Sequence, residues 1–213
     1  MNHPRIAITG GIGSGKSYVC RLLKEQGIEV FNCDLVAKDI IATDNDVRDR
    51  LTALINAEDA TERAKTATER AEDDATGTEA AADAPRSGHI ALTKESLGAY
   101  KRSGADKAAK VNAIVHPRVA QAFNDSGLQW MESAILFESG FDRLVDRIVV
   151  VTCPTEERIR RIVARDHCDQ ATALRWMALQ MTDEERLARA TAHIVNDGQT
   201  PLEPQIASLL TCQ

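Results

Sequence analysis

The chain lacks the cysteine spacing that marks a zinc site or a disulfide framework. Its five cysteines are an odd number among 213 residues, lie far apart and include no Cys-x-x-Cys pair. We therefore expect reduced thiols in a cytoplasmic protein. A long apolar run is also missing before Gly10, so we expect neither a signal peptide nor a membrane anchor.

The sequence also lacks an excess of basic over acidic residues. The formal net charge is -6 and no basic stripe is evident, which argues against a general nucleic-acid binder. The hydrophobic content of 43% can bury one sizeable core, so we expect a single domain. We expect no nucleic-acid or membrane partner, and the oligomeric state stays open, a homo-oligomer included.

A third absence falls in the middle of the chain. Residues 57–87 contain no Leu, Ile, Val, Met or aromatic residue and therefore cannot contribute to a core. The sequence Ala-Thr-Glu-Arg-Ala occurs twice there at heptad spacing, but it offers only alanine as a seam, so a coiled coil is not expected. We expect a polar insertion that is disordered or partly helical, with a partner-binding element as the alternative.

Apart from that insertion, short apolar runs alternate with helical patterns, which predicts an α/β fold with a parallel sheet. Helical segments after the insertion are expected to break at Gly104 and at Pro117, and a long helical region is expected after residue 153. The expected strands are residues 5–9, 28–34, 128–138, 146–153 and 193–196.

A phosphate-binding turn stands between the first expected strand and helix. Gly10, Gly15, Lys16 and Ser17 satisfy Gly-x-x-x-x-Gly-Lys-Ser/Thr in the context that this motif requires. In such a loop, backbone N–H groups surround the β-phosphate, Lys16 reaches the β and γ oxygens, and the Ser17 hydroxyl is a ligand for Mg²⁺. The residues expected to contact ATP are Gly11, Ile12, Gly13, Ser14, Gly15, Lys16 and Ser17.

Two signatures of other phosphate-loop proteins are missing. The sequence has no Asn-Lys-x-Asp segment for reading guanine and no Leu-Ser-Gly-Gly segment of a transporter ATPase. Small-molecule kinases remain, and such enzymes need a carboxylate near the acceptor hydroxyl, a cationic lid and an acceptor-binding subdomain.

Asp34 is the candidate carboxylate, because it stands at the carboxyl end of the second expected strand, on the ligand-binding edge of an open sheet. The alternative is that Asp34 only caps the helix that follows. The candidate lid carries arginines at helical spacing, although an ordinary solvated helix face would have the same pattern. These arginines are Arg158, Arg161, Arg165 and Arg175.

Six segments together resemble the dephospho-coenzyme A kinase family nearly from end to end, with only residues 57–87 outside the resemblance. They are ITGGIGSGKS, NCDLVAKDI, IVHPRV, ESAILFESGF, RIRRIVARD and HIVNDG. The resemblance implies a three-layer P-loop kinase fold with a helical acceptor-binding insertion and a helical lid. The implied parts are a core of about 1–45, 128–160 and 190–213, an acceptor-binding subdomain of about 46–127, and a lid of about 161–189.

The resemblance also implies a reaction, the transfer of the γ-phosphate of Mg-ATP to the ribose 3′-hydroxyl of dephospho-CoA. Asp34 would accept or orient the hydroxyl proton, Arg161 and Arg165 would grip the phosphates, and Thr9 would line the cleft. His116 and Pro117 match the acceptor-side signature. We expect Pro117 to break a helix and His116 to stand at the helix end, where the dipole favours the charged imidazole.

Three positions depart from the family pattern: Asn32 replaces a common aspartate, Tyr18 a threonine and Ala134 a proline. Glu132 is a possible supporting carboxylate. The turn near Asn196 is a candidate part of the adenine pocket or an ordinary turn. Two alternative functions stay open, a nucleoside or nucleoside-monophosphate kinase and a non-catalytic ATP-binding regulatory module.

Overall fold

The computed structural model describes residues 4–73 and 90–211, with side chains described outside residues 67–73. The chain divides into two compact units. The first comprises Met1–Ala37 and Val119–Gln213, and the second comprises Lys38–Arg118.

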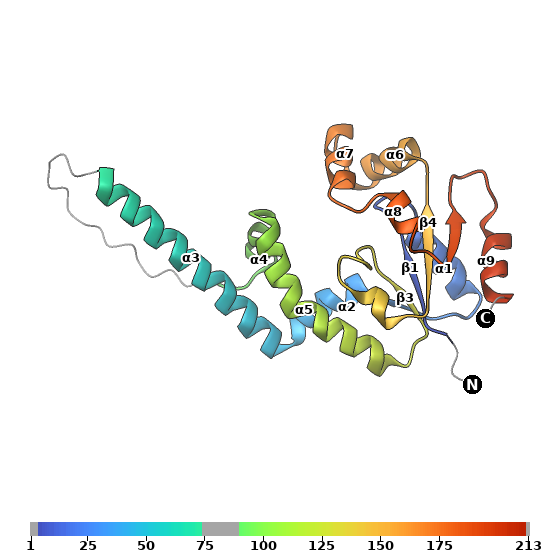
Figure 1. Ribbon diagram of the computed structural model, residues 1–213, viewed down its shortest axis with the longest axis horizontal. Helices are drawn as coiled ribbons and strands as arrows, with labels where there is room; N and C mark the ends of the chain where they lie inside the picture. The colour runs from blue at the N-terminus through green and yellow to red at the C-terminus, as the bar shows by residue number, and fades with distance from the viewer. Residues whose placement is uncertain (1–3, 74–89, 212–213) are drawn as a thin grey trace. The chain divides into compact units, whose positions relative to one another are not determined.

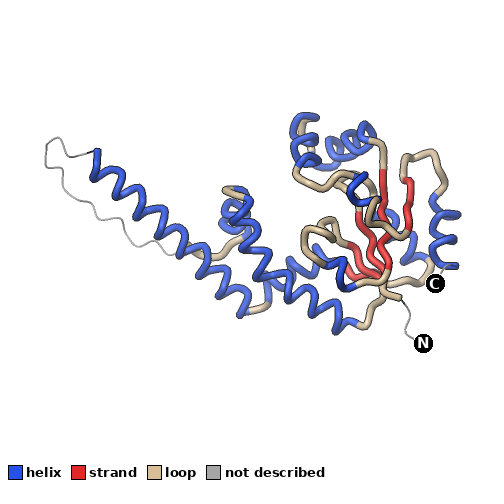
Figure 2. Tube along the Cα trace, in the orientation of Figure 1, coloured by secondary structure: helices blue, strands red, loops and turns tan. Residues whose placement is uncertain are grey.

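The first unit is built on a parallel sheet of five strands in the order β2-β3-β1-β4-β5 (Figures 1 and 2). This confirms the expected α/β fold with a parallel sheet. The strand bounds are β1 Ile6–Thr9, β2 Val30–Asn32, β3 Trp130–Glu132, β4 Arg147–Thr152 and β5 Ala192–Val195.

The register brings the carboxyl ends of the central strands to one level. Ile8 of β1 is paired with Glu132 of β3 and Val149 of β4, and Asn32 of β2 is also paired with Glu132. Open parallel sheets bind ligands at this edge. The loop after β1 therefore emerges directly beside Glu132.

Helices cover both faces of the sheet. On one face, α1 (Lys16–Glu25) and α9 (Leu202–Thr211) lie side by side and pack on apolar strand residues. On the other face, the Phe31 ring of β2 packs edge-on against Phe123 of α5 (Ala105–Ser126), with ring centroids 5.3 Å apart. Strands covered on both faces carry nearly continuous apolar residues, which explains why all four residues of β1 are buried.

β2 and β3 are several residues shorter than the expected strands 28–34 and 128–138. β3 ends at Glu132, and the apolar residues that follow are buried in successive turns rather than in a strand. Backbone bonds from Ser139 N to Ile135 O and from Phe141 N to Leu136 O close those turns at 2.9 and 3.0 Å. The apolar pattern correctly predicted that these residues are buried but not their conformation. A short buried run has the same apolar pattern in a strand as in a series of turns.

The expected long helical region after β4 is three helices: α6 (Thr155–Asp166), α7 (Gln170–Ala178) and α8 (Asp183–Leu187). α6 ends at His167, which is left-handed with φ 52°. The Asp169 side chain then caps α7, and that of Thr182 caps α8. These caps divide one charged stretch into separate elements.

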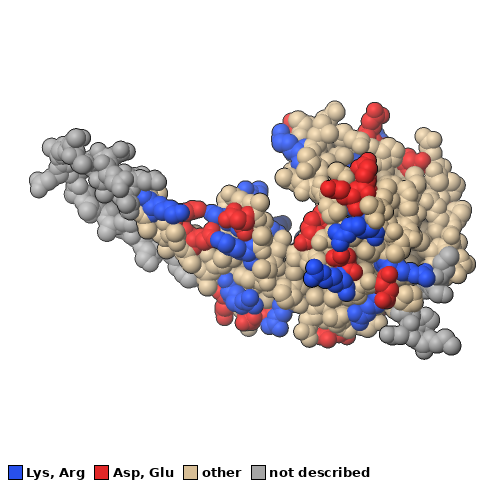
Figure 3. All heavy atoms as spheres, viewed as in Figure 1, with Lys and Arg blue, Asp and Glu red and all other residues tan. Residues whose placement is uncertain are grey.

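The second unit contains α3 (Asn45–Asp73), α4 (Lys94–Arg102), most of α2 (Cys33–Thr43) and the first part of α5. Residues 57–73 of the polar insertion are helical because they belong to α3, which agrees with the expectation of a partly helical segment; residues 74–87 lie outside the described residues. Lys107 of α5 pairs with Glu62 of α3 at 2.6 Å. On the face drawn in Figure 3, Lys and Arg side chains lie among Asp and Glu side chains.

The expected helix break at Pro117 is wrong, whereas the one at Gly104 is confirmed, because α4 and α5 lie on either side of it. α5 runs through Pro117 to Ser126. A proline inside a helix costs about 3 kcal/mol. A buried apolar stripe at four-residue spacing offsets that cost on both sides of the proline, and it consists of Val111, Val115, Val119 and Phe123.

Candidate active site

The loop between β1 and α1 forms a compact phosphate-binding turn, as the motif predicts. Ser14 N donates to Gly11 O at 3.1 Å, and α1 begins directly after Gly15. Gly15 is left-handed with φ 88°, and a Cβ there would lie 2.0 Å from Nδ2 of Asn196. Only glycine fits this position, because both the conformation and the close approach exclude a side chain.

Asn196, directly after β5, supports this turn from behind. Its Nδ2 donates to Ser14 O at 2.8 Å, and the residue is buried. Its side chain therefore holds the phosphate loop.

Lys16 is buried, and its ammonium is held inside the loop. Nζ donates to Gly10 O at 2.8 Å and to Gly11 O at 3.3 Å. Burial lowers the pKa of Lys16 to about 8; the nearby Glu132 carboxylate opposes this shift, and the Arg186 guanidinium adds to it. The lysine therefore stands in an environment where an anionic phosphate would strongly favour its charged form.

Glu132, at the end of β3, connects the loop with the neighbouring strand. Its Oε1 accepts a hydrogen bond from Ser17 Oγ, and its Oε2 accepts one from Asn32 Nδ2, both at 2.9 Å. Glu132 is buried, so its charge is held beside Ser17 by these two donors. Asn32 departs from the family pattern, and its amide holds the Glu132 carboxylate in place. The sequence suggested Glu132 only as a supporting carboxylate.

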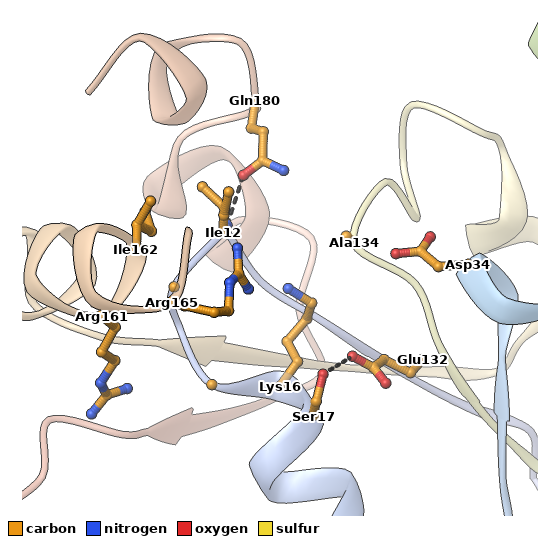
Figure 4. A pocket seen from close by; sticks show the side chains of 12 residues that line it. Ile12, Lys16, Ser17, Asp34, Glu132, Ala134, Arg161, Ile162, Arg165 and Gln180 are labelled. Atoms are coloured by element: carbon orange, nitrogen blue, oxygen red, sulfur yellow. Dashed lines mark hydrogen bonds between the residues drawn. The ribbon is translucent and has the colours of Figure 1, made fainter. Parts of the chain in front are cut away.

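Asp34 lies in the first turn of α2, two residues beyond the end of β2, and not at the strand end as expected. The alternative that Asp34 caps this helix is not supported, because Leu35 N donates to Oδ1 of Asn32 at 2.9 Å. With the capping done by Asn32, the Asp34 carboxylate points toward the cavity (Figure 4).

One cavity of about 440 Å³ brings these residues together. Lys16 and Ser17 form its floor, Asp34 and Ala134 lie on one wall, and Arg165 and Gln180 come from the helices after β4 (Figure 4). Its lining residues are Ile12, Gly13, Gly15, Lys16, Ser17, Asp34, Glu132, Ala134, Arg161, Ile162, Arg165 and Gln180.

The candidate lid arginines have different positions. Arg165 extends into the cavity, and its guanidinium pairs with Asp166 (Figure 4). Arg161 points away from Lys16 and donates to Ser14 O at 3.4 Å and Asn196 O at 3.2 Å. Arg161 therefore supports the back of the loop, whereas Arg165 is the arginine directed toward the cavity.

Arg158 is buried against the front of the loop. Its Nε donates to Ile12 O at 2.9 Å, and its Nη1 lies 3.2 Å from Asp183 of α8. Arg175, the fourth arginine of the pattern, is exposed on α7 and donates to Thr172 Oγ1. It is the member of the set that matches a solvated helix face.

Gln180 is a cavity residue that the sequence did not suggest. It lies between α7 and α8, and its Oε1 accepts a hydrogen bond from Ile12 N at 2.8 Å. No local pattern marks such a residue, because the contact joins positions 168 apart. Glu132 carried a weak signal, an acidic residue at the end of an apolar run.

Three residues expected on the substrate side, Thr9, His116 and Pro117, do not line this cavity. Thr9 is fully buried and is absent from the cavity lining. His116 and Pro117 lie in the interior of α5 and in the second unit. His116 is therefore not at a helix end as expected, and burial, aided by the Lys101 charge, lowers its pKa and disfavours the charged imidazole.

Comparison with known proteins identifies the family. The family model described as Dephospho-CoA kinase matches residues 5–68 and 87–201. A Dephospho-CoA kinase from Bacteroides fragilis is 37% identical over 97% of this chain and 91% of the relative. The chain belongs to the dephospho-CoA kinase family. A further member of this name, from Chlorobium chlorochromatii, is 32% identical over 91% of this chain and 85% of the relative.

Solved structures agree with the phosphate-loop kinase fold expected for a dephospho-CoA kinase. A structure from Thermus thermophilus has a TM-score of 0.66 at 26% identity and covers 99% of this chain and 96% of that one. Dephospho-CoA kinase from Campylobacter jejuni has a TM-score of 0.53 at 16% identity, with 97% and 94% coverage. A shikimate kinase from Acinetobacter baumannii has a TM-score of 0.52 at 15% identity, with 98% and 92% coverage. The last two show a shared fold alone.

The family match also shortens the segment that lies outside the family pattern, from residues 57–87 to residues 69–86. Because the dephospho-CoA kinase model resumes at residue 87 after ending at residue 68, the first part of the polar segment falls within the family pattern.

Within the described part of the chain, Cys20, Cys33, Cys153 and Cys168 are free thiols. No described helix combines the length and apolar character needed to cross a membrane.

Proposed function

We propose that this protein transfers the γ-phosphate of ATP to the ribose 3′-hydroxyl of dephospho-CoA, giving coenzyme A and ADP. The observation that carries the proposal is that Lys16 of the phosphate loop and Asp34 line the same cavity. Membership of the family, whose relatives are named for this acceptor, supports the choice of substrate.

Asp34 is the proposed proton acceptor for the attacking hydroxyl. Its carboxylate points into the cavity and is free of the capping role that Asn32 fills. A positioned carboxylate can accept or orient the hydroxyl proton as the oxygen attacks the γ-phosphorus. Lys16 and the loop N–H groups stabilise the negative charge on the phosphoryl oxygens during transfer.

The residues around Ser17 fit a magnesium ion. Ser17 Oγ and the Glu132 carboxylate are adjacent oxygen groups on the cavity floor, and Asp34 adds a carboxylate to the wall. The described residues contain no cluster of three or more His, Cys, Asp or Glu suited to hold a metal alone. This suits Mg²⁺, which is bound through few protein groups together with substrate phosphates. When bound, Mg²⁺ neutralises charge on the β- and γ-phosphates.

We infer that residues 161–189 act as a lid and that residues 46–127 bind the acceptor, with His116 and Pro117 shaping its pocket. Arg165 and Gln180, both within the lid segment, line the cavity and support the first inference. Arg165 is the proposed cation for the transferring phosphoryl group, and Arg161 grips the loop that holds the phosphates. A cytoplasmic location is consistent with the free thiols.

The deciding measurement is ADP release from Mg-ATP with dephospho-CoA, adenosine, a nucleoside monophosphate or no acceptor. Turnover that depends on dephospho-CoA, together with coenzyme A as the product by mass, is the expected result. A 3′-deoxy analogue of dephospho-CoA should give no product, because it lacks the attacking hydroxyl. Turnover with adenosine or the monophosphate would favour a nucleoside or nucleotide kinase. If no acceptor supported turnover, a regulatory module would be favoured.

A further inference from the structure

Gln180 occupies a cavity position that the roles above do not explain. It lies in the turn between α7 and α8, far along the chain from the phosphate loop, yet it lines the same cavity as Lys16 and Asp34. Its side chain contacts the loop at Ile12, one of the residues expected to contact ATP.

The chemistry of the Ile12 contact fixes the orientation of the Gln180 amide. A backbone N–H only donates, so the atom 2.8 Å from Ile12 N must be the side-chain oxygen. The amide nitrogen then lies on the opposite side, and Figure 4 shows it directed toward the wall formed by Ala134 and Asp34. Among residues 4–73 and 90–211, Nε2 has no hydrogen-bond partner, so two N–H donors face the cavity.

The turn that carries Gln180 is held on both sides. Gln180 N donates to Met177 O at 3.2 Å, and Thr182 begins α8 with a capping box. The fully buried Arg186 donates to Met181 O, and Asp183 lies 3.3 Å from Arg186 Nη1. This buried arginine therefore fixes Met181, directly after Gln180, and Asp183 at the start of α8. A donor held in this way loses little freedom when it binds a ligand.

We propose that Gln180 binds the transferring γ-phosphoryl group through its amide nitrogen while its amide oxygen holds the phosphate loop. The donors lie between the loop, where Lys16 binds the donor nucleotide, and Asp34 on the acceptor side. Lys16 and Arg165 make this part of the cavity cationic, which favours an anionic group at that position. The proposal rests on the kinase function above but not on the identity of the acceptor.

The test compares binding of ADP and of a β,γ-imido analogue of ATP, both with Mg²⁺ and without acceptor. Gln180→Met removes both ends of the amide, and Gln180→Glu keeps an oxygen for Ile12 N–H but presents a carboxylate to the phosphate. We expect both variants to lose at least about tenfold in affinity for the analogue relative to ADP, and to lose about 10² in kcat. Leu179→Ala, at the exposed neighbouring position, is the matched control and should keep the wild-type ratio.

Each other outcome overturns the proposal. Equal losses for ADP and the analogue would mean that Gln180 only supports the loop, and tighter binding of both would mean that it blocks the loop. A change confined to the acceptor KM would place Gln180 on the acceptor. A wild-type ratio in Gln180→Glu, with a wild-type melting temperature, would also overturn it. The two binding affinities are measured without acceptor, so their ratio tests the proposal even if dephospho-CoA proves not to be the substrate.

Discussion

Ser17 Oγ donates a hydrogen bond to Glu132 Oε1 at 2.9 Å, joining the phosphate loop to the end of the neighbouring strand. The two residues are 115 positions apart in the sequence. They meet because β1 and β3 are adjacent parallel strands with Ile8 paired to Glu132. This contact places the serine hydroxyl beside a buried carboxylate, and these are two of the oxygen groups that we propose for Mg²⁺.

Glu132→Gln should therefore raise the Mg²⁺ concentration needed for half-maximal activity by about tenfold or more. The amide can still accept from Ser17, but it has no charge for a hard cation. ADP affinity measured in a chelator should stay near wild type. An unchanged Mg²⁺ requirement would exclude Glu132 from the metal environment. Ser17→Thr, which keeps the hydroxyl, is the conservative control.

Asp34→Asn should lower kcat by about 10² to 10⁴, the usual worth of a positioned general base. Nucleotide affinity should change little, because Asp34 lies on the wall of the cavity and not in the phosphate loop. Steady-state kinetics and ADP titration measure the two quantities separately. A variant with wild-type kcat would refute the assignment of Asp34 as the base.

Arg165 and Arg161 should respond differently to replacement by methionine. The Arg165 side chain is 61% exposed and pairs with the neighbouring Asp166 carboxylate, so Arg165→Met should lower kcat by about 10² to 10³ without changing the melting temperature. Arg161→Met should weaken ADP binding and lower the melting temperature, because it removes the bonds to Ser14 O and Asn196 O.

Arg160→Met is the matched control for both arginine variants, since Arg160 is exposed and pairs with the same glutamate as Arg161. Neither kcat nor the melting temperature should change in it. If Arg161→Met lowered kcat alone, Arg161 would act on the phosphoryl group instead of on the loop.

ADP affinity, measured in a chelator, should depend on pH through Lys16. The charged lysine binds phosphate, and in the free protein its pKa is lowered to about 8. Below pH 8 the lysine is already protonated and affinity should be nearly constant. Above pH 8, binding must take up a proton, so affinity should fall by about tenfold per pH unit. The Lys16→Met variant should lose this dependence, and persistence of the slope would assign it to another group.

Replacing residues 69–86 with a short Gly-Ser linker should leave kcat and the melting temperature near wild type. These residues lie outside the family match and contain no large apolar side chain. The ion pairs of Glu58 and Glu62 with α5 stay intact in this variant. A large fall in activity would show that the segment takes part in substrate binding.

The phosphate loop could be predicted from sequence because its chemistry is local. Gly10, Gly15, Lys16 and Ser17 need only their mutual spacing and a strand and helix on either side. Asp34 could be placed near the correct edge because parallel strands end together. Its position in the first turn of α2, and the transfer of the capping role to Asn32, depend on where β2 stops pairing with β3.

Residues whose roles depend on distant contacts could not be predicted. The arginines of α6 share one helical spacing, and only the packing of α6 against the loop separates Arg161 from Arg165. Gln180 carries no local signal at all, since its partner Ile12 is set by tertiary structure. Pro117 is the opposite case, in which a strong local rule was overridden by the buried stripe along α5.

The contact between Asn196 and Ser14 has a consequence for biosynthesis. The phosphate loop leaves the ribosome before β5, but one of its carbonyl groups is satisfied by a side chain 182 residues later. Translation proceeds from the N-terminus, so the nascent loop lacks this support until β5 has been made. The nucleotide site thus becomes complete only after β5 has been synthesised, and ATP can stabilise the folded kinase but not intermediates that lack β5.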